Sequence, residues 1–311
     1  MSPKILITPR SLTRSGHSEI AKLEAAGYQP IYCTPGQTPS EDEMISLLPG
    51  CVGWLAGVEP ITSTVLESAK ELRAISRNGT GINNVDLDAA KRLNIAVLRA
   101  EGANAQGVAE LAMGLLFALV RSIPFSDAHL KSSQWERRQG IELVGKTLGL
   151  VGCGAIGRIV AKSAIGCGMN VVGYDPFPNE AFSKTPGFTY ASLDEVCAKA
   201  DFLSLHCPPP EGKPLVDADR IASMKEGVYL VNTARGELLD DAAVISALDS
   251  GKLSGVAIDA FRKEPPMDDP LVKHAKVIAT PHVGAFTKES VSRAVGIAID
   301  NLLRFLEKSA G

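Results

Sequence analysis

The chain has 311 residues, of which 45% are hydrophobic and 22% are charged, and its formal net charge is -3. This length exceeds the size at which a single hydrophobic core stops growing, so two domains are expected. The small negative charge provides no global basic field, which excludes nucleic acid and anionic membranes as expected partners.

The cysteines and the apolar segments predict a cytoplasmic protein. Six cysteines are scattered without a CxxC pair, a pattern that fits neither a disulfide scaffold nor a zinc site, so no metal is expected. The N-terminal MSPKILITPR lacks the long apolar region of a signal peptide. The longest apolar stretch, residues 111–120, is too short to span a bilayer and predicts a buried helix.

The first hundred residues alternate short apolar runs with helical patterns, which is typical of a parallel α/β domain. The expected strands are KILIT (4–8), QPIYC (29–33), CVGWLAG (51–57), ELRAISRNGTG (71–81) and NIAVLRA (94–100). A helical pattern from about residue 108 to 121 then leads to a second series, which places a hinge near residue 100.

Six further strand runs follow the hinge and predict a doubly wound sheet. They are KTLGLVGCGAIG (146–157), NVVGYD (170–175), DFLSLHC (201–207), GVYLVNTARG (227–236), SGVAIDAF (254–261) and KVIATPHVGA (276–285). The terminal segment, residues 288–308, has helical spacing with no further strand, and could pack back on the first domain.

The sequence Gly152-Cys153-Gly154-Ala155-Ile156-Gly157 lies between a predicted strand and a predicted helix. In this context the first glycine allows a tight turn, the second lets the backbone approach a pyrophosphate, and the third lets the helix pack on the strand. Asp175 ends the next strand, where its carboxylate can accept hydrogen bonds from the ribose hydroxyls and repel a 2'-phosphate. The pattern predicts NAD binding; the alternatives are a structural turn and a solvated carboxylate.

Three polar residues, Arg235, Glu264 and His282, each follow an apolar strand run. Together they suit the reduction of a 2-oxo acid: a guanidinium for the substrate carboxylate and carbonyl, a histidine as proton donor, and a carboxylate to orient and charge it. Each alone has a simpler interpretation, as a strand-end cap, a loop charge or a turn residue.

Several segments in order resemble the D-isomer-specific 2-hydroxyacid dehydrogenase family, closest in appearance to its D-3-phosphoglycerate dehydrogenases. They are NGTGINNVDLDAA, NAQGVAEL, GKTLGLVGCGAIG, VVGYDP, LHCPPP, LVNTARGELLD, GVAIDAFRKEPP and TPHVGAFTKES, and they extend from about residue 50 to 290.

The resemblance assigns roles to residues that spacing alone does not. It implies substrate binding by Arg235, an increase in imidazole basicity by Glu264, and proton transfer by His282. It also implies a carboxylate-binding loop of Asn78, Gly79, Thr80 and Gly81 with Arg77 beside it. Asp259 would contact the nicotinamide carboxamide, and the backbone around Cys207, Pro208 and Thr233 would line the cofactor groove, with Gly152, Gly154, Ala155, Ile156, Gly157 and Asp175. His206 is interpreted as structural.

The expected architecture is α/β, with two Rossmann-like doubly wound domains, parallel sheets and an active-site cleft between the domains. The substrate domain would comprise residues 1–99 and 288–311, and the NAD-binding domain residues 100–287. The resemblance also implies a homodimer, with the apolar helix 108–121 at or near its interface.

The substrate is harder to predict than the chemistry. The first hypothesis is oxidation of 3-phosphoglycerate to 3-phosphohydroxypyruvate, with Arg10 and Arg14 as candidates to hold the phosphate. The alternatives are a glyoxylate or hydroxypyruvate reductase, a sugar-acid dehydrogenase, and, from a different class, an NADH-sensing corepressor-like protein. Arg99 and Gly107 depart from the family pattern. The sequence leaves their role, the acid, the physiological direction, the oligomeric state and the pathway open.

Overall fold

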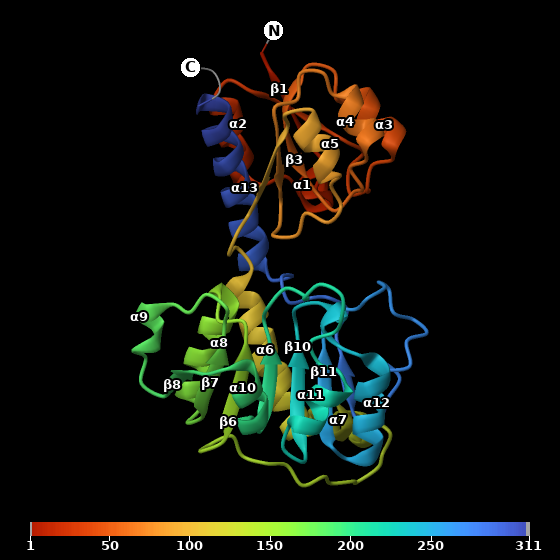
Figure 1. Ribbon diagram of the computed structural model, residues 1–311. Coiled ribbons are helices and arrows are strands. Elements are labelled where there is room, and N and C mark those ends of the chain that lie inside the picture. The colour runs from red at the N-terminus through yellow and green to blue at the C-terminus, as the bar shows by residue number, and fades with distance from the viewer. Residues whose placement is uncertain (1, 309–311) are drawn as a thin grey trace. The chain divides into compact units, whose positions relative to one another are not determined.

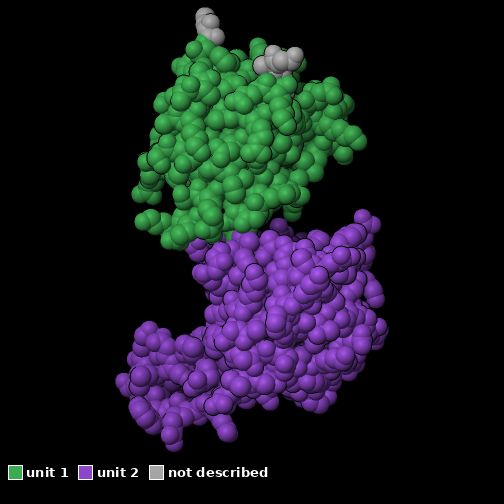
Figure 2. Space-filling view, turned by 90° about the vertical axis from the view of Figure 1, so that its left-hand side faces the viewer, with its two compact units in different colours: residues 1–104, 288–311 green, residues 105–287 purple. Residues whose placement is uncertain are grey.

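The chain folds into two compact units, and the computed structural model describes residues 2–308 (Figure 1). Unit 1 comprises residues 1–104 together with residues 288–311, and unit 2 comprises residues 105–287 (Figure 2). Each unit has its own parallel sheet, as the sequence predicts. The assignment of substrate to one unit and cofactor to the other, with an active site in a cleft between them, stays a prediction.

Within the described part of unit 1, five parallel strands form a sheet in the order β2-β1-β3-β4-β5. All five expected strands form. Their bounds are β1 (Lys4–Ile7), β2 (Gln29–Tyr32), β3 (Cys51–Ala56), β4 (Ala74–Arg77) and β5 (Ala96–Arg99). From β1 the chain moves to one side of the sheet and from β3 to the other, so the topological switch point lies between β1 and β3.

Helices cover both faces of the unit 1 sheet. They are α1 (Arg10–Ser15), the 3-10 turn η1 (Ser18–Ile20), α2 (Ala21–Ala25), α3 (Glu41–Leu47), α4 (Ser63–Ser68), α5 (Leu87–Arg92) and α13 (Lys288–Lys308). Helices α3, α4 and α5 contribute to one core cluster, and α1, α2 and α13 to the other. Helix α13 buries Val295, Ile299, Leu302 and Leu306 in the core cluster that it shares with β1 and β3.

The described residues of unit 2 form a seven-stranded parallel sheet in the order β12-β11-β10-β9-β6-β7-β8. The bounds are β6 (Thr147–Val151), β7 (Asn170–Tyr174), β8 (Phe188–Tyr190), β9 (Phe202–Leu205), β10 (Val228–Asn232), β11 (Leu253–Ile258) and β12 (Val277–Ala279). Strand β8 is not among the expected strands, because three residues are too few to show a period. The switch point lies between β6 and β9.

Helices also cover both faces of the second sheet. They are α6 (Ala105–Val120), α7 (Ile123–Lys131), α8 (Ala155–Gly166), α9 (Glu180–Ser183), α10 (Leu193–Lys199), α11 (Ala218–Ser223) and α12 (Asp241–Ser250), with the 3-10 turn η2 (Gly236–Leu238). Helices α6 and α8 share one core cluster, and α10, α11 and α12 share the other. Within residues 2–308 no single helix passes the length and hydropathy test for a membrane span; α6 and α7 pass it only as a pair, bent by 62° at the break between them.

Candidate active site

The predicted dinucleotide loop joins β6 to α8, and two of its three glycines are required by close contacts. Gly152 has φ of 95°, and a Cβ there would lie 2.5 Å from the carbonyl of His206. A Cβ on Gly157 would overlap the carbonyl oxygen of Gly152. By contrast, nothing lies within 4 Å of a Cβ on Gly154, the residue before α8. The loop is therefore packed tightly on its inner side and open at the N-terminus of α8, where backbone N–H groups suit phosphates.

The side chain of Asp175 is hydrogen-bonded to this loop. Its carboxylate accepts hydrogen bonds from the backbone N–H of Cys153 at 2.7 Å and from that of Phe177 at 2.9 Å. Each oxygen thus keeps a further lone pair for an outside donor, such as a ribose hydroxyl. The structure brings the acid and the glycine loop together as the sequence predicts.

Other predicted cofactor residues lie at the carboxyl ends of the neighbouring strands. The hydroxyl of Thr233, after β10, is buried and has no hydrogen-bond partner among the described residues. Cys207, after β9, is half-buried, and burial raises the pKa of its thiol to about 11, so it lines the site as a neutral group. Three features therefore fit a bound dinucleotide: the accessible N-terminus of α8, the carboxylate of Asp175 and the unpartnered hydroxyl of Thr233.

His206 packs beneath the glycine loop and is a neutral residue. Its Nε2 lies 2.8 Å from the Ser204 hydroxyl oxygen, and its Nδ1 is buried without a partner in the part of the chain that the structure describes. Burial lowers the pKa of His206 to about 4. The imidazole is therefore uncharged at neutral pH, in agreement with its interpretation as structural.

His282 and Glu264 form a direct pair. Nδ1 of His282 lies 2.8 Å from Oε1 of Glu264, and that oxygen also accepts the backbone N–H of Phe261 at 3.2 Å. Both side chains are accessible, at 46% and 42% exposure. His282 has φ of 52°, an unusual conformation for a residue with a side chain. The pair leaves the second imidazole nitrogen available for proton exchange.

Asp259 holds the segment that carries His282. It is 1% exposed, and its carboxylate accepts hydrogen bonds from the Thr280 hydroxyl at 2.6 Å, from Val283 N at 2.9 Å and from Gly284 N at 2.8 Å. These donors lie on both sides of His282 in sequence. The family resemblance implies only a nicotinamide contact for Asp259, and this bracing role was not predictable from the sequence.

Arg235 follows β10 in a turn shaped by a buried amide. Nδ2 of Asn232 donates to the Arg235 carbonyl at 2.8 Å, and Oδ1 of Asn232 accepts from Ala234 N at 3.1 Å. The next residue, Gly236, is packed so tightly that a Cβ would overlap the backbone of Phe261 and Arg262. This contact joins the turn of Arg235 to the segment that leads to Glu264.

The remaining predicted residues lie in unit 1, at the carboxyl end of β4. Arg77 is 6% exposed; its Nε donates to the Gly81 carbonyl and its Nη1 to the Ala56 carbonyl, each at 3.1 Å. Burial lowers the pKa of Arg77. The backbone N–H of Asn78 donates to the same Ala56 carbonyl at 2.9 Å, and Oδ1 of Asn78 is buried without a partner among residues 2–308. Gly79 and Thr80 complete this loop.

Comparison with known proteins identifies the chain. A family model described as "D-isomer specific 2-hydroxyacid dehydrogenase, NAD binding domain" matches residues 113–284. The chain belongs to this family. The matched residues lie within unit 2 and include the glycine loop and the His282–Glu264 pair, and the cofactor of this domain is NAD. The predicted recognition and cofactor are confirmed.

Individual relatives agree with the family assignment. The chain is 41% identical to a D-3-phosphoglycerate dehydrogenase of Methanocaldococcus jannaschii over 79% of this chain and 48% of the relative. It is 41% identical to the Homo sapiens D-3-phosphoglycerate dehydrogenase over 83% of this chain and 49% of the relative. The chain therefore spans about half the length of the curated relatives it matches. The crystal structure of the TT0316 protein from Thermus thermophilus has a TM-score of 0.85 at 33% identity, over 98% of this chain and 97% of that one.

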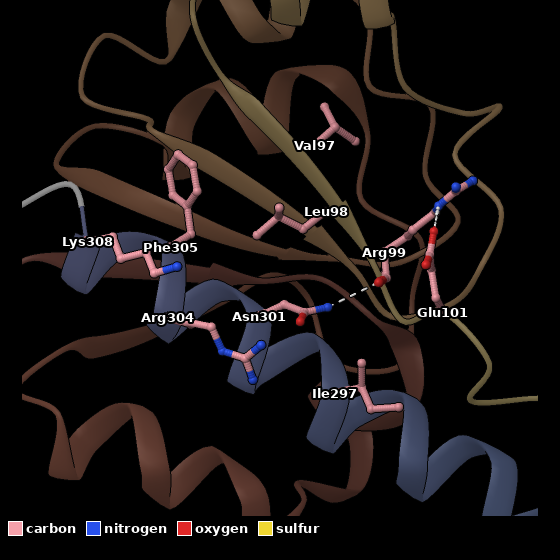
Figure 3. Close-up of a pocket in the computed structure, with 9 residues that line it drawn as sticks. All are labelled: Val97, Leu98, Arg99, Glu101, Ile297, Asn301, Arg304, Phe305 and Lys308. Carbon is pink, nitrogen blue, oxygen red and sulfur yellow. Dashed lines mark hydrogen bonds and ion pairs between the residues drawn. The ribbon is translucent and has the colours of Figure 1, made fainter.

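One departure from the family pattern lies at a separate groove of unit 1. The groove has a volume of about 540 Å³ and lies between β5 and α13 (Figure 3). Here Arg99 forms an ion pair with Glu101 at 2.7 Å, and the Arg99 carbonyl accepts from Nδ2 of Asn301 at 3.1 Å (Figure 3). Apart from Arg99 and Glu101, the residues that line the groove are Val97, Leu98, Ile297, Asn301, Arg304, Phe305 and Lys308. None of them belongs to the candidate active site, so Arg99 is best interpreted as a surface charge.

Proposed function

We propose that the protein is an NAD-dependent oxidoreductase that transfers a hydride between nicotinamide and C2 of a small 2-hydroxy or 2-oxo acid. The observation that carries this proposal is the 2.8 Å contact between His282 Nδ1 and Glu264. It supplies an oriented acid-base group at the same edge of the sheet as the glycine loop, because all strands of unit 2 run parallel.

The residues have distinct roles in this reaction. NAD, when bound, accepts or supplies the hydride. Glu264 accepts a hydrogen bond from Nδ1–H of His282, so Nε2 is the nitrogen presented to the substrate. During reduction Nε2 donates a proton to the carbonyl oxygen, and during oxidation it removes the proton of the hydroxyl group. The contact with Glu264 fixes the orientation of the imidazole. Arg235 binds the substrate carboxylate and polarises the carbonyl.

The substrate carboxylate is proposed to bind in the loop of Arg77, Asn78, Gly79 and Thr80. The glycine allows close approach of the backbone, and the N–H groups suit an anion. The buried, unpartnered Oδ1 of Asn78 supports a ligand here, because an unmet acceptor is costly unless a donor reaches it.

The names of the curated relatives support 3-phosphoglycerate as a first candidate substrate, with 3-phosphohydroxypyruvate as its product. The alternatives are glyoxylate, hydroxypyruvate or a sugar-derived acid. A corepressor-like NADH sensor is the alternative from another class, and it would bind NADH without turnover.

The test is NAD(H) turnover, measured by absorbance, with 3-phosphoglycerate in the oxidative direction and phosphohydroxypyruvate, hydroxypyruvate, glyoxylate and pyruvate in the reductive direction. The proposal predicts turnover of at least one of them, with NADH preferred over NADPH. NADH binding without turnover of any 2-oxo acid, including a panel of sugar-derived acids, would refute the enzymatic proposal.

We also propose that the protein is a cytoplasmic homodimer. Exposed apolar side chains gather along one segment that follows α6: Ile123, Leu130, Trp135 and Val144 are 52%, 62%, 83% and 71% exposed. Such a segment suits a self-association surface. The proposal predicts a dimer mass by light scattering, which Trp135→Glu should lower, whereas Phe177→Glu, at an equally exposed aromatic residue, should not.

The six free cysteines support a reducing compartment, as proposed for a cytoplasmic protein.

A further inference from the structure

A buried polar cluster occupies the topological switch point of unit 1. Thr8 directly follows β1 and Gly57 directly follows β3, the two strands between which the order of the sheet reverses. Ligands of open α/β sheets bind outside the carboxyl ends of the strands at such a point. The polar groups here therefore face the position at which a ligand is expected.

Glu59 is the centre of this cluster. It is 1% exposed, and its Oε1 accepts the backbone N–H of Gly57 at 2.9 Å and the hydroxyl of Thr8. The Thr8 hydroxyl oxygen in turn accepts from Nε1 of Trp54 at 2.9 Å. Both donors point at one carboxylate oxygen of Glu59, so the hydrogen-bonding capacity of that oxygen is met inside the protein.

Arg77 carries the opposite charge. Burial lowers the pKa of its guanidinium, and the electrostatic interaction with Glu59 acts in the other direction. Two of its N–H groups are already used by the carbonyls of Gly81 and Ala56. The peptide group between Ala56 and Gly57 connects Glu59 to the predicted substrate loop. Its N–H, from Gly57, donates to the carboxylate of Glu59, and its carbonyl, from Ala56, accepts the backbone N–H of Asn78, where the loop starts.

We propose that Glu59 is a specificity residue that limits the charge of the substrate. By cancelling the charge of Arg77, it makes the buried part of this site neutral overall. The site then favours 2-hydroxy and 2-oxo acids whose carboxylate is the only negative charge, over acids with an added phosphate or second carboxylate. The inference rests on the proposed function, and it ranks the unphosphorylated alternatives ahead of 3-phosphoglycerate.

The nearby cations on α1 do not reverse this balance. Arg10 and Arg14 are both exposed. Charges in solvent are screened over about 8 to 10 Å at ordinary ionic strength, whereas buried charges are screened much less. The interior pair of Glu59 and Arg77 is therefore expected to dominate the discrimination.

The test compares kcat/KM for hydroxypyruvate with that for phosphohydroxypyruvate, which differ only in the phosphate, in the wild type, Glu59→Gln and Val58→Lys. Glutamine keeps an acceptor for Gly57 and Thr8 but removes the charge. Val58 is 62% exposed, so lysine there adds a positive charge beside Glu59 without disturbing the core. Glu71→Gln is the matched control, because Glu71 also accepts a backbone N–H, that of Gly50 at 3.4 Å.

The wild type should prefer hydroxypyruvate. Glu59→Gln should raise relative activity on the phosphorylated acid on the order of ten-fold, the effect of a unit charge roughly 10 Å away in a partly buried site. Val58→Lys places its added charge in solvent and should change this ratio much less. The control should leave the ratio unchanged. A wild-type preference for phosphohydroxypyruvate, or an unchanged ratio in a Glu59→Gln variant that still reduces hydroxypyruvate, would overturn the inference and leave the proposed function intact. Failure of the wild type to reduce any 2-oxo acid would instead refute the proposed function.

Discussion

His206 makes the stability of unit 2 depend on pH, and His206→Gln should remove that dependence. The folded protein holds the pKa of this imidazole at about 4, because burial penalises the charged form, whereas the ordinary value is 6.5. Glutamine preserves a polar atom near Nε2, the atom that contacts Ser204. The variant therefore removes the titrating group while keeping its hydrogen bond.

The sign follows from proton binding. Below pH 6.5 the unfolded chain takes up a proton on His206, but the folded chain does so only near pH 4, so acid favours unfolding. This contribution is absent above about pH 6.5 and grows as the pH falls toward 4. With these two pKa values, the loss at pH 5 is about 2 kcal/mol, and its limit below pH 4 is about 3.4 kcal/mol.

Urea unfolding followed by circular dichroism at pH 7.5 and pH 5 measures this effect. The free energy of unfolding of the wild type should fall by about 2 kcal/mol more than that of His206→Gln over this interval. Ser204→Ala is the control: it keeps the buried imidazole and should keep the wild-type pH dependence. Equal pH dependence in the wild type and His206→Gln would refute the assignment of a buried neutral histidine.

Three further predictions concern the active site. His282→Ala should lower turnover by roughly 10²–10⁴-fold while NADH still binds, since positioned acid-base groups contribute that much; retained turnover would contradict the role of His282. Gly236→Ala should lower kcat at least ten-fold with unchanged NADH affinity, because its Cβ would overlap the backbone of Arg262 and shift the turn of Arg235. Gly114→Ala in α6, where a Cβ meets nothing within 4 Å, is its control; equal kcat in the two variants would count against the packing argument. Asp175→Ala should weaken NADH binding and narrow the preference for NADH over NADPH in fluorescence titrations, whereas an unchanged preference would remove Asp175 from cofactor selection.

The fold was predictable where apolar runs were long and bounded by turn residues. The strands β1, β3, β6 and β10 are buried nearly throughout, and parallel strands covered on both faces appear as continuous apolar runs. The three-residue β8 and the short α1 gave no periodic signal. The N-cap residue of α1 is Pro9, which provides no side-chain cap, so the usual start signal was missing.

The candidate site was predictable where its residues lie in a local motif. The glycine loop and Asp175 stand at a spacing set by one strand-helix-strand unit, and His282 and Glu264 each follow a strand. The supporting contacts were not predictable, because they join residues far apart in sequence: Thr8 and Glu59 are 51 positions apart, and Asp259 and Gly284 are 25 apart. No local pattern distinguishes such a buried carboxylate from a solvated one.

The central claim is that hydride passes between NADH and C2 of a 2-oxo acid. The most direct measurement uses NADH carrying deuterium at the transferable position, with product analysis by mass spectrometry after incubation with each 2-oxo acid that the protein reduces. We expect one deuterium on C2 of the 2-hydroxy acid, and roughly 10²-fold less of this product, or lower still, when His282→Ala replaces the wild type over the same time. NADH that binds but is never consumed, or a product labelled elsewhere, would contradict it.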